Sequence, residues 1–151
     1  MKYLLPCLLL AFCLKACSKH VYTVQSVGLV SEQNGTITIR STGFGKTADE
    51  AMNSAEQYAI ELLLFRGLPG SQQTTPLVEI DEATAKSRYK QYFEELLTSG
   101  RHKTFVLSSI PVSDFAKHDR SQRNMTMDIR INLTALRSDL ETHSVIRKFG
   151  Y

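Results

Sequence analysis

Residues 36–67 have the sequence TITIRSTGFGKTADEAMNSAEQYAIELLLFRG, and this stretch decides the fold of the chain. Residues 36–42 alternate in the two-residue period of a half-buried strand. In residues 47–66, Thr47 and Glu50 form a capping box, after which apolar side chains recur every three or four positions. These positions are Ala48, Ala51, Met52, Ala55, Ala59, Leu62 and Leu63. The stretch therefore predicts a strand followed by an amphipathic helix, which a glycine and a proline end.

Three further segments complete the predicted sheet. Residues 21–30 are rich in β-branched and aromatic side chains, and Asn34-Gly35 joins them to the strand just described as a hairpin. Residues 104–112 predict a strand at a sheet edge or a bulge, because Pro111 cannot donate to a hydrogen-bond ladder. In residues 125–133 every odd position is apolar and every even position is polar, which predicts a strand with one buried face.

Two more helices are predicted. Residues 82–98 place Tyr89, Tyr92, Phe93, Leu96 and Leu97 on one helical face, and Gly100 follows the end. Thr134 is the expected cap of a short helix that carries Leu136 and Leu140. Hairpin-joined strands with two successive helices predict an α+β fold, a two-layer sandwich. We expect a mainly antiparallel sheet of about four strands, two main helices on one face and a short C-terminal helix.

The first seventeen residues have the features of a bacterial lipoprotein export signal. Lys2 supplies a positive start, and residues 4–14 form an apolar run too short to span about 30 Å of hydrocarbon as a helix. Ala16 precedes Cys17 as the small residue precedes the lipidated cysteine in the lipobox that this segment resembles. We expect cleavage between Ala16 and Cys17 and a diacylglycerol and an N-acyl chain on Cys17. An ordinary signal peptide cut elsewhere, or a buried apolar strand, is the alternative.

This signal sets the expected domain organisation and location. Residues 1–16 are the signal peptide, residues 17–20 are the lipidated cysteine with a short tether, and residues 21–151 form a single α+β domain. By resemblance to other lipoproteins, Ser18 after the cysteine favours sorting to the outer membrane. We expect a lipid-anchored protein on its periplasmic face.

Charge and cysteine content exclude several classes of partner. The chain has 18 basic and 15 acidic side chains, and Lys2 and Lys15 leave with the signal peptide. The near-neutral remainder lacks the electrostatic footprint of a nucleic-acid-binding protein. Cys7 and Cys13 also leave and Cys17 is acylated, so no thiol remains for catalysis, metal ligation or a disulfide.

The segment Gly43-Phe-Gly-Lys-Thr47 lies between a predicted strand and a predicted helix, as a phosphate-binding loop does. Such a loop needs a further glycine five positions before Gly45, where this chain has Arg40. We interpret Gly43 and Gly45 as permissive turn residues and Thr47 as a helix cap. The sequence therefore predicts no nucleotide ligand.

No other constellation indicates catalysis. Glu94 and Glu95 are adjacent on a helix and cannot face one substrate together. The chain has no Gly-x-Ser-x-Gly elbow, and no two histidines share one-turn spacing. We expect a protein that is not an enzyme, holds no metal and needs no cofactor apart from its lipid. Its histidines are expected to be solvated: His20, His102, His118 and His143.

Two groups of residues are candidates for binding. The aromatic residues Tyr89 and Tyr92 either belong to the core or stack on sugars as a glycan-binding surface. The C-terminal segment is either a frayed end or a peptide that docks into a partner by its aromatic side chains and terminal carboxylate. Its candidate partner-binding residues are Arg147, Lys148, Phe149 and Tyr151.

A lipidated start, a strand ending in Gly43-Phe-Gly45 and an alanine-striped helix are similar to small outer-membrane lipoproteins related to the N-terminal domain of flagellar assembly protein T. The similarity covers residues 36–67. More loosely, the size, the anchor and Leu64-Phe-Arg-Gly-Leu-Pro-Gly70 resemble the accessory lipoprotein of the trans-envelope complex in subtype iii type VI secretion systems. These resemblances imply an α+β module that associates with envelope machinery and carries no catalytic residues.

Together these features predict a noncatalytic lipoprotein that anchors or scaffolds a trans-envelope assembly, such as a secretion apparatus. Its partners would be the outer membrane, other subunits of that assembly, or further copies of itself in an oligomer. The competing hypothesis is a periplasmic lipoprotein that binds peptidoglycan or another glycan.

Overall fold

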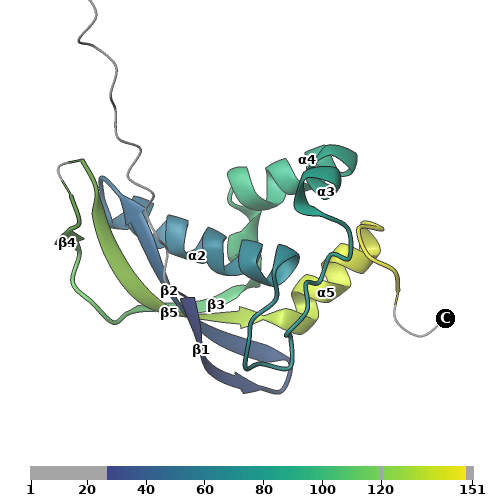
Figure 1. The fold of residues 1–151 in the computed structure, drawn as a ribbon, viewed down its shortest axis with the longest axis horizontal. Coiled ribbons are helices and arrows are strands. Elements are labelled where there is room, and N and C mark those ends of the chain that lie inside the picture. Colours follow the sequence, from purple (N-terminus) through teal and green to yellow (C-terminus); the bar gives the residue numbers. More distant parts are fainter. Residues whose placement is uncertain (1–26, 120, 149–151) are drawn as a thin grey trace, which may run out of the picture.

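The computed structural model describes residues 27–119 and 121–148 (Figure 1). The strands are β1 (Val27–Gln33), β2 (Thr36–Gly45), β3 (Val106–Pro111), β4 (Ala116–Lys117) and β5 (Arg123–Asn132). The helices are α2 (Ala48–Phe65), α3 (Glu82–Arg88), α4 (Lys90–Phe93) and α5 (Leu133–Thr142), with a π-helical turn η1 (Glu94–Thr98) and a 3-10 turn η2 (Arg101–Phe105). The predicted signal peptide, the lipidation site and the start of the first predicted strand lie outside the described residues.

The sheet is antiparallel throughout and has the order β1-β2-β5-β3, with β4 paired to the start of β5. Helix α2 lies across this sheet, and α3 to η1 continue beside α2 (Figure 1). Phe65 of α2 meets Phe93 of α4 there, with ring centroids 5.4 Å apart. The predicted α+β sandwich is confirmed.

Strands β2 and β5 form the centre of the sheet and pair with each other along their whole length. Their register runs from Thr36 opposite Asn132 to Gly45 opposite Arg123. The face turned toward α2 carries side chains that are almost fully buried: Ile37, Ile39, Met125, Met127, Ile129 and Ile131. Burying one such aliphatic side chain contributes about 1.5–3 kcal/mol, so this face supplies much of the stability.

The opposite face of the central strands is polar. Arg40 donates two hydrogen bonds to the Asp128 carboxylate, at 2.7 and 2.9 Å, and Thr42 bonds the Thr126 hydroxyl at 2.9 Å. These cross-strand pairs fix the register from the solvent side. The predicted hairpin turn is confirmed as well, since Asn34 and Gly35 have φ of 49° and 72°, the left-handed pair of a tight hairpin turn.

Gly43 and Gly45 are strand residues rather than turn residues, which corrects the interpretation made from the sequence. A Cβ at Gly43 would overlap the carbonyl oxygen of Ala51 and the amide of Ala55 in α2. A Cβ at Gly45 would lie 2.5 Å from the Glu50 Cβ. The glycines are therefore needed because the backbone of α2 approaches β2 too closely for any side chain.

The start of α2 is capped nearly as predicted. The Thr47 hydroxyl accepts the Glu50 amide proton at 3.2 Å, which is one half of the capping box. The Glu50 carboxylate accepts from the amide of Lys46, at 2.7 Å, instead of returning to Thr47. The helix ends at Phe65, and Gly67, two residues later, supplies the expected left-handed residue with a φ of 75°.

The second predicted helix is not continuous. Tyr89, with φ of −115° and ψ of 42°, separates α3 from α4, and η1 widens into a π turn closed by the Ser99 amide bonding the Glu94 carbonyl at 2.9 Å.

Two other boundaries also differ. The predicted strand at residues 104–112 begins only at Val106, and the Asn132 side chain, not Thr134, caps α5 by accepting from Ala135 at 2.9 Å.

Candidate functional site

Two groups of binding residues that the sequence suggested separately meet in one groove. We call it the α3–α5 groove, and its volume is about 620 Å³. The residues that line the groove are Glu79, Ile80, Arg88, Tyr89, Glu141, Ser144, Val145, Ile146, Arg147 and Lys148. Tyr89 comes from the predicted glycan-binding pair, whereas Arg147 and Lys148 come from the predicted docking tail. Phe149 and Tyr151 of that tail lie outside the described residues.

Local backbone breaks shape the groove. The chain leaves α5 through Ser144, whose φ of 57° is unusual for a residue other than glycine. The amide of Val145 then bonds the Leu140 carbonyl at 2.9 Å, and the Val145 side chain is buried in the core. After this turn Arg147 lines the groove, and Tyr89, where the backbone breaks between α3 and α4, lines it as well.

Tyr92 does not belong to this groove. Its side chain is only 8% exposed, and its hydroxyl donates to the Asp139 carboxylate at 2.7 Å. Arg101 donates to the same carboxylate at 3.0 Å and lies over the Tyr92 ring, 4.8 Å from its centroid. Burial, followed by the bond to Asp139, raises the pKa of Tyr92 far above its usual range. Of the two alternatives for Tyr92, these contacts favour the core, because the ring forms part of a bridge between α4, η2 and α5.

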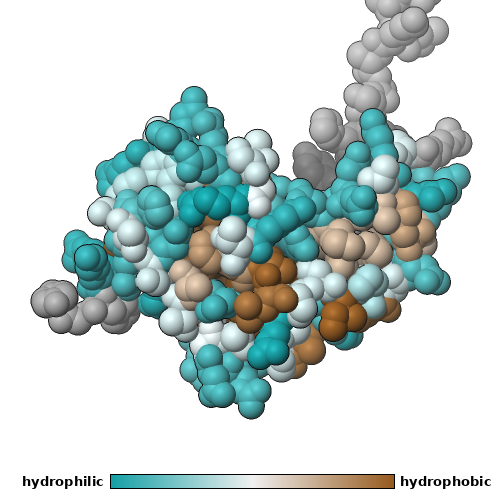
Figure 2. Space-filling model, turned by 180° about the vertical axis from the view of Figure 1, so that it is seen from behind, coloured by the Kyte–Doolittle hydropathy of each residue, from teal (hydrophilic) through white to brown (hydrophobic). Residues whose placement is uncertain are grey.

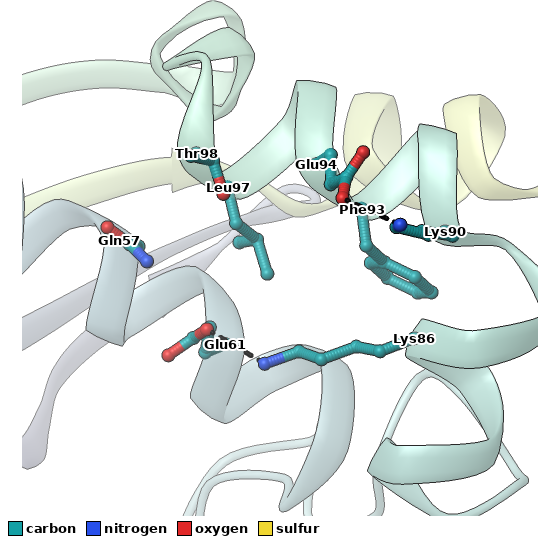
Figure 3. A pocket seen from close by; sticks show the side chains of 8 residues that line it. All are labelled: Gln57, Glu61, Lys86, Lys90, Phe93, Glu94, Leu97 and Thr98. Carbon is teal, nitrogen blue, oxygen red and sulfur yellow. Dashed lines mark hydrogen bonds and ion pairs between the residues drawn. The ribbon is translucent and has the colours of Figure 1, made fainter.

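A second, smaller pocket lies between α2 and the segment from α3 to η1. It has a volume of about 400 Å³, and Phe93 and Leu97 point into it between charged side chains (Figure 3). Lys86 is held by the Glu61 carboxylate at 3.2 Å and by Glu82 at 2.7 Å. Lys90 lies 3.7 Å from the Glu94 carboxylate. Since its cations already have internal partners, this pocket offers less to a charged ligand than the α3–α5 groove does.

A buried polar cluster links α2, η2 and β3. The Ser109 hydroxyl donates to the Glu56 carboxylate at 2.6 Å, and His102 lies with its Nε2 atom 3.9 Å from the same carboxylate. His102 Nδ1 bonds the Leu96 carbonyl at 3.2 Å. The expectation of a solvated histidine is wrong for His102, which is fully buried, and burial lowers its pKa. His118 and His143 are exposed as expected, and His20 lies outside the described residues.

This cluster does not have the geometry of a catalytic triad. In a triad the imidazole lies between the nucleophile and the carboxylate, so that it can take the nucleophile's proton. Here the Glu56 carboxylate lies between Ser109 and His102. The arrangement ties β3 and η2 to α2. Sequence reasoning missed it, because the three residues are far apart in the chain and share no motif.

Among the described residues, three of the four exposed large aliphatic side chains lie in the edge strand β3 or directly after it. Leu107 is 52% exposed, Ile110 is 59% exposed and Val112, just after the strand, is 44% exposed. Residues 106–112 contain no charged side chain. Seen from behind, the molecule shows hydrophobic side chains gathered in the lower centre of the surface and interrupted by polar ones (Figure 2). Edge strands are usually protected by charged residues, so this edge is a candidate interaction surface.

Within residues 27–119 and 121–148, no group of three or more His, Cys, Asp or Glu side chains is arranged to hold a metal ion. In the same part of the chain, no helix has the length and apolar character needed to cross a bilayer. Comparison with protein-family models, with curated proteins and with solved structures finds no match to this chain. Its function is therefore inferred from its own residues.

Proposed function

We propose that this protein is a noncatalytic outer-membrane lipoprotein that anchors a trans-envelope assembly at the periplasmic face of the membrane. The resemblance of its sequence to an accessory lipoprotein makes a type VI secretion membrane complex our first choice of assembly. Cys17 would carry the lipid, and the folded domain would hold another subunit.

The observation that carries this proposal is the uncharged outer edge of β3, which Pro111 and a bulge between Val106 and Ser108 interrupt but no described strand covers. Strand β3 pairs with β5 on one side, and no described strand pairs with its other side. Its free backbone groups and the exposed side chains of Leu107, Ile110 and Val112 suit an extended segment that adds as a further strand. The segment we propose is an uncharged, apolar strand of an assembly subunit, because β3 itself offers no charge to complement.

The mechanism is anchorage by effective concentration. A single acyl chain binds membranes only weakly, whereas the multiple chains of a lipoprotein cysteine hold it stably. A subunit bound at β3 is then confined close to the membrane. Its encounter with neighbouring subunits becomes effectively intramolecular, which strengthens the assembly without any new contact.

Site-specific photocrosslinking in cells tests the docking surface. A photoreactive residue at Ile110 should give one discrete adduct, and mass spectrometry should locate it in an extended apolar segment of an envelope-assembly subunit. The matched control is Ser87, an exposed position on α3, which should give none. An adduct between two copies of this chain, or equal labelling from both positions, would overturn the adaptor role.

Lipidation is tested separately. Cells grown with labelled palmitate should incorporate it into the wild-type protein and not into the Cys17→Ser variant. The variant should also leave the membrane fraction while its purified domain remains folded. Unchanged membrane fractionation of Cys17→Ser would refute the anchor and leave the β3 surface to be judged by its own crosslinks.

A further inference from the structure

We propose that the α3–α5 groove binds a carboxylate-bearing saccharide of the peptidoglycan type. This goes beyond anchorage, because it gives the protein a second attachment inside the periplasm. The choice of peptidoglycan among acidic saccharides rests on the proposed periplasmic location, whereas the groove and its chemistry do not.

The shape of the groove suits a ligand of two or three sugar rings. Its volume of about 620 Å³ lies within the range of about 300–1,000 Å³ that is usual for small-molecule sites. Ile80, Val145 and Ile146 give it apolar walls, and its three chain segments are held by the cap of α3 and by the bonds that end α5. The site is therefore formed before a ligand arrives.

Three cations of the groove, against the carboxylates of Glu79 and Glu141, leave it a net positive charge that favours an anionic ligand. Arg88, Arg147 and Lys148 are exposed, and none of them forms an ion pair with another described residue. By contrast, Lys86 and Arg101 elsewhere in the domain each have carboxylate partners. Cations without internal partners gain from a carboxylate on a ligand, most of all when an arginine can bind it through two parallel hydrogen bonds.

The remaining polar and aromatic groups favour a saccharide over a simple anion. Tyr89 presents a half-buried aromatic side chain, a group on which the apolar face of a sugar ring can stack. Glu79 is exposed, lines the same groove and offers oxygen atoms that accept hydrogen bonds from sugar hydroxyls. A ligand with hydroxyls, an apolar ring face and a carboxylate uses all these groups at once, as an N-acetylmuramyl unit with its peptide does.

The test is cosedimentation of the purified full-length chain, in detergent, with isolated peptidoglycan sacculi. We expect the wild type to sediment with sacculi and to be released as the salt concentration rises. The Arg147→Glu/Lys148→Glu double variant and Tyr89→Ala should each weaken binding by about tenfold. The matched control, Lys46→Glu/Lys117→Glu, reverses two exposed charges near β4 at the far end of the molecule and should bind as the wild type does (Figure 1).

Several results would overturn the proposal. One is a wild type that stays in the supernatant, and another is a pair of groove variants that sediment like the wild type. Competition by a neutral chitin oligosaccharide as strong as that by a soluble muropeptide would show that the carboxylate is not recognised. Competition by an acidic peptide that lacks sugar, but not by the muropeptide, would assign the groove to a peptide instead. Circular dichroism of each variant separates lost binding from lost folding, and Tyr89→Phe should retain binding where Tyr89→Ala loses it.

Discussion

Replacing Gly43 with alanine should destabilise the protein more than any other single methyl addition to the sheet. A Cβ at this position would overlap two backbone atoms of α2, the Ala51 carbonyl oxygen and the Ala55 amide nitrogen, and would lie 2.9 Å from the Ala55 Cβ. No side-chain rotation can remove an overlap with backbone atoms. Helix α2 must therefore move away from β2 as a unit.

The cost follows from what that movement separates. Non-bonded heavy atoms in favourable contact lie about 3.5 Å apart, whereas this Cβ would lie far inside that distance from the Ala51 carbonyl oxygen, so α2 must retreat by about 1.5 Å near Gly43. Overpacking of a core costs about 1–3 kcal/mol, and the buried alanine stripe of Ala51, Ala55 and Ala59 places this case at the upper end. Reduced entropy of the unfolded chain returns about 0.4–1 kcal/mol, which leaves a net loss of about 2 kcal/mol.

Urea unfolding followed by far-UV circular dichroism measures this loss. The matched control is Gly28→Ala in β1, because a Cβ there meets no atom within 4 Å and its backbone is not left-handed. The control should unfold within about 0.5 kcal/mol of the wild type, or be slightly more stable. If Gly43→Ala had the same unfolding free energy as the Gly28→Ala control, α2 would not pack against β2 this closely, and the close approach of α2 would not explain why Gly43 and Gly45 are glycines.

Three further predictions concern buried and exposed side chains. Burial lowers the pKa of His102 below the ordinary histidine value of about 6.5, so on acidification the unfolded chain binds a proton before the folded one does. The contribution of His102 to stability should therefore be complete above about pH 6.5 and fall as the pH drops below it, and His102→Gln should flatten that fall in thermal unfolding curves. Tyr92→Phe removes the hydroxyl that donates to Asp139 and should cost about 1–2 kcal/mol in urea unfolding. The control Tyr58→Phe removes a hydroxyl that bonds no other described residue and should cost about 0.5 kcal/mol or less. Ile110→Lys should leave the unfolding free energy unchanged within about 0.5 kcal/mol, because the side chain is 59% exposed. The same variant should no longer recover the crosslinked β3 partner, and unaltered recovery of that partner would exclude β3 as the docking edge.

The sequence predicted those parts of the fold that depend on neighbouring residues. Alternation in residues 125–131 identified β5 and its buried face, and the spacing of Ala51, Ala55 and Ala59 identified the face of α2 that meets the sheet. Asn34-Gly35 identified the hairpin turn. Each is a periodic or turn signal that is complete within about twenty residues, so no knowledge of the partner surface was needed.

The features that sequence reasoning missed depend on contacts between distant segments. The role of Gly43 becomes apparent only when α2 is placed on β2, and the burial of His102 depends on Glu56 and Leu96 closing around it. The sequence predicted one continuous helix over residues 82–98, because the residues on either side of Tyr89 keep a favourable helical composition, and so it missed the break at Tyr89. The α3–α5 groove joins residues near position 80 to residues near position 145, and no local pattern brings these together.

The sheet order gives the proposed functions a consistent geometry. Strand β1, the first described after the proposed anchor, and strand β3 lie at opposite edges, separated by β2 and β5. Ten residues connect Cys17 to Val27, and an extended chain covers at most about 3.5 Å per residue, so β1 lies within about 35 Å of a lipidated Cys17. Strands are about 4.8 Å apart, which places β3 about 14 Å beyond β1 across the sheet. The chain thus enters the sheet at the edge opposite the one proposed for the protein partner, and the groove beside α5 lies at the other end of the molecule from β4 (Figure 1). The residues that form the β3 edge and those that line the groove do not overlap, so one copy can hold the partner and the saccharide together. A β3-bound partner and a muropeptide should therefore bind without competing, and mutual exclusion in a binding assay would show that two of these surfaces have been assigned wrongly.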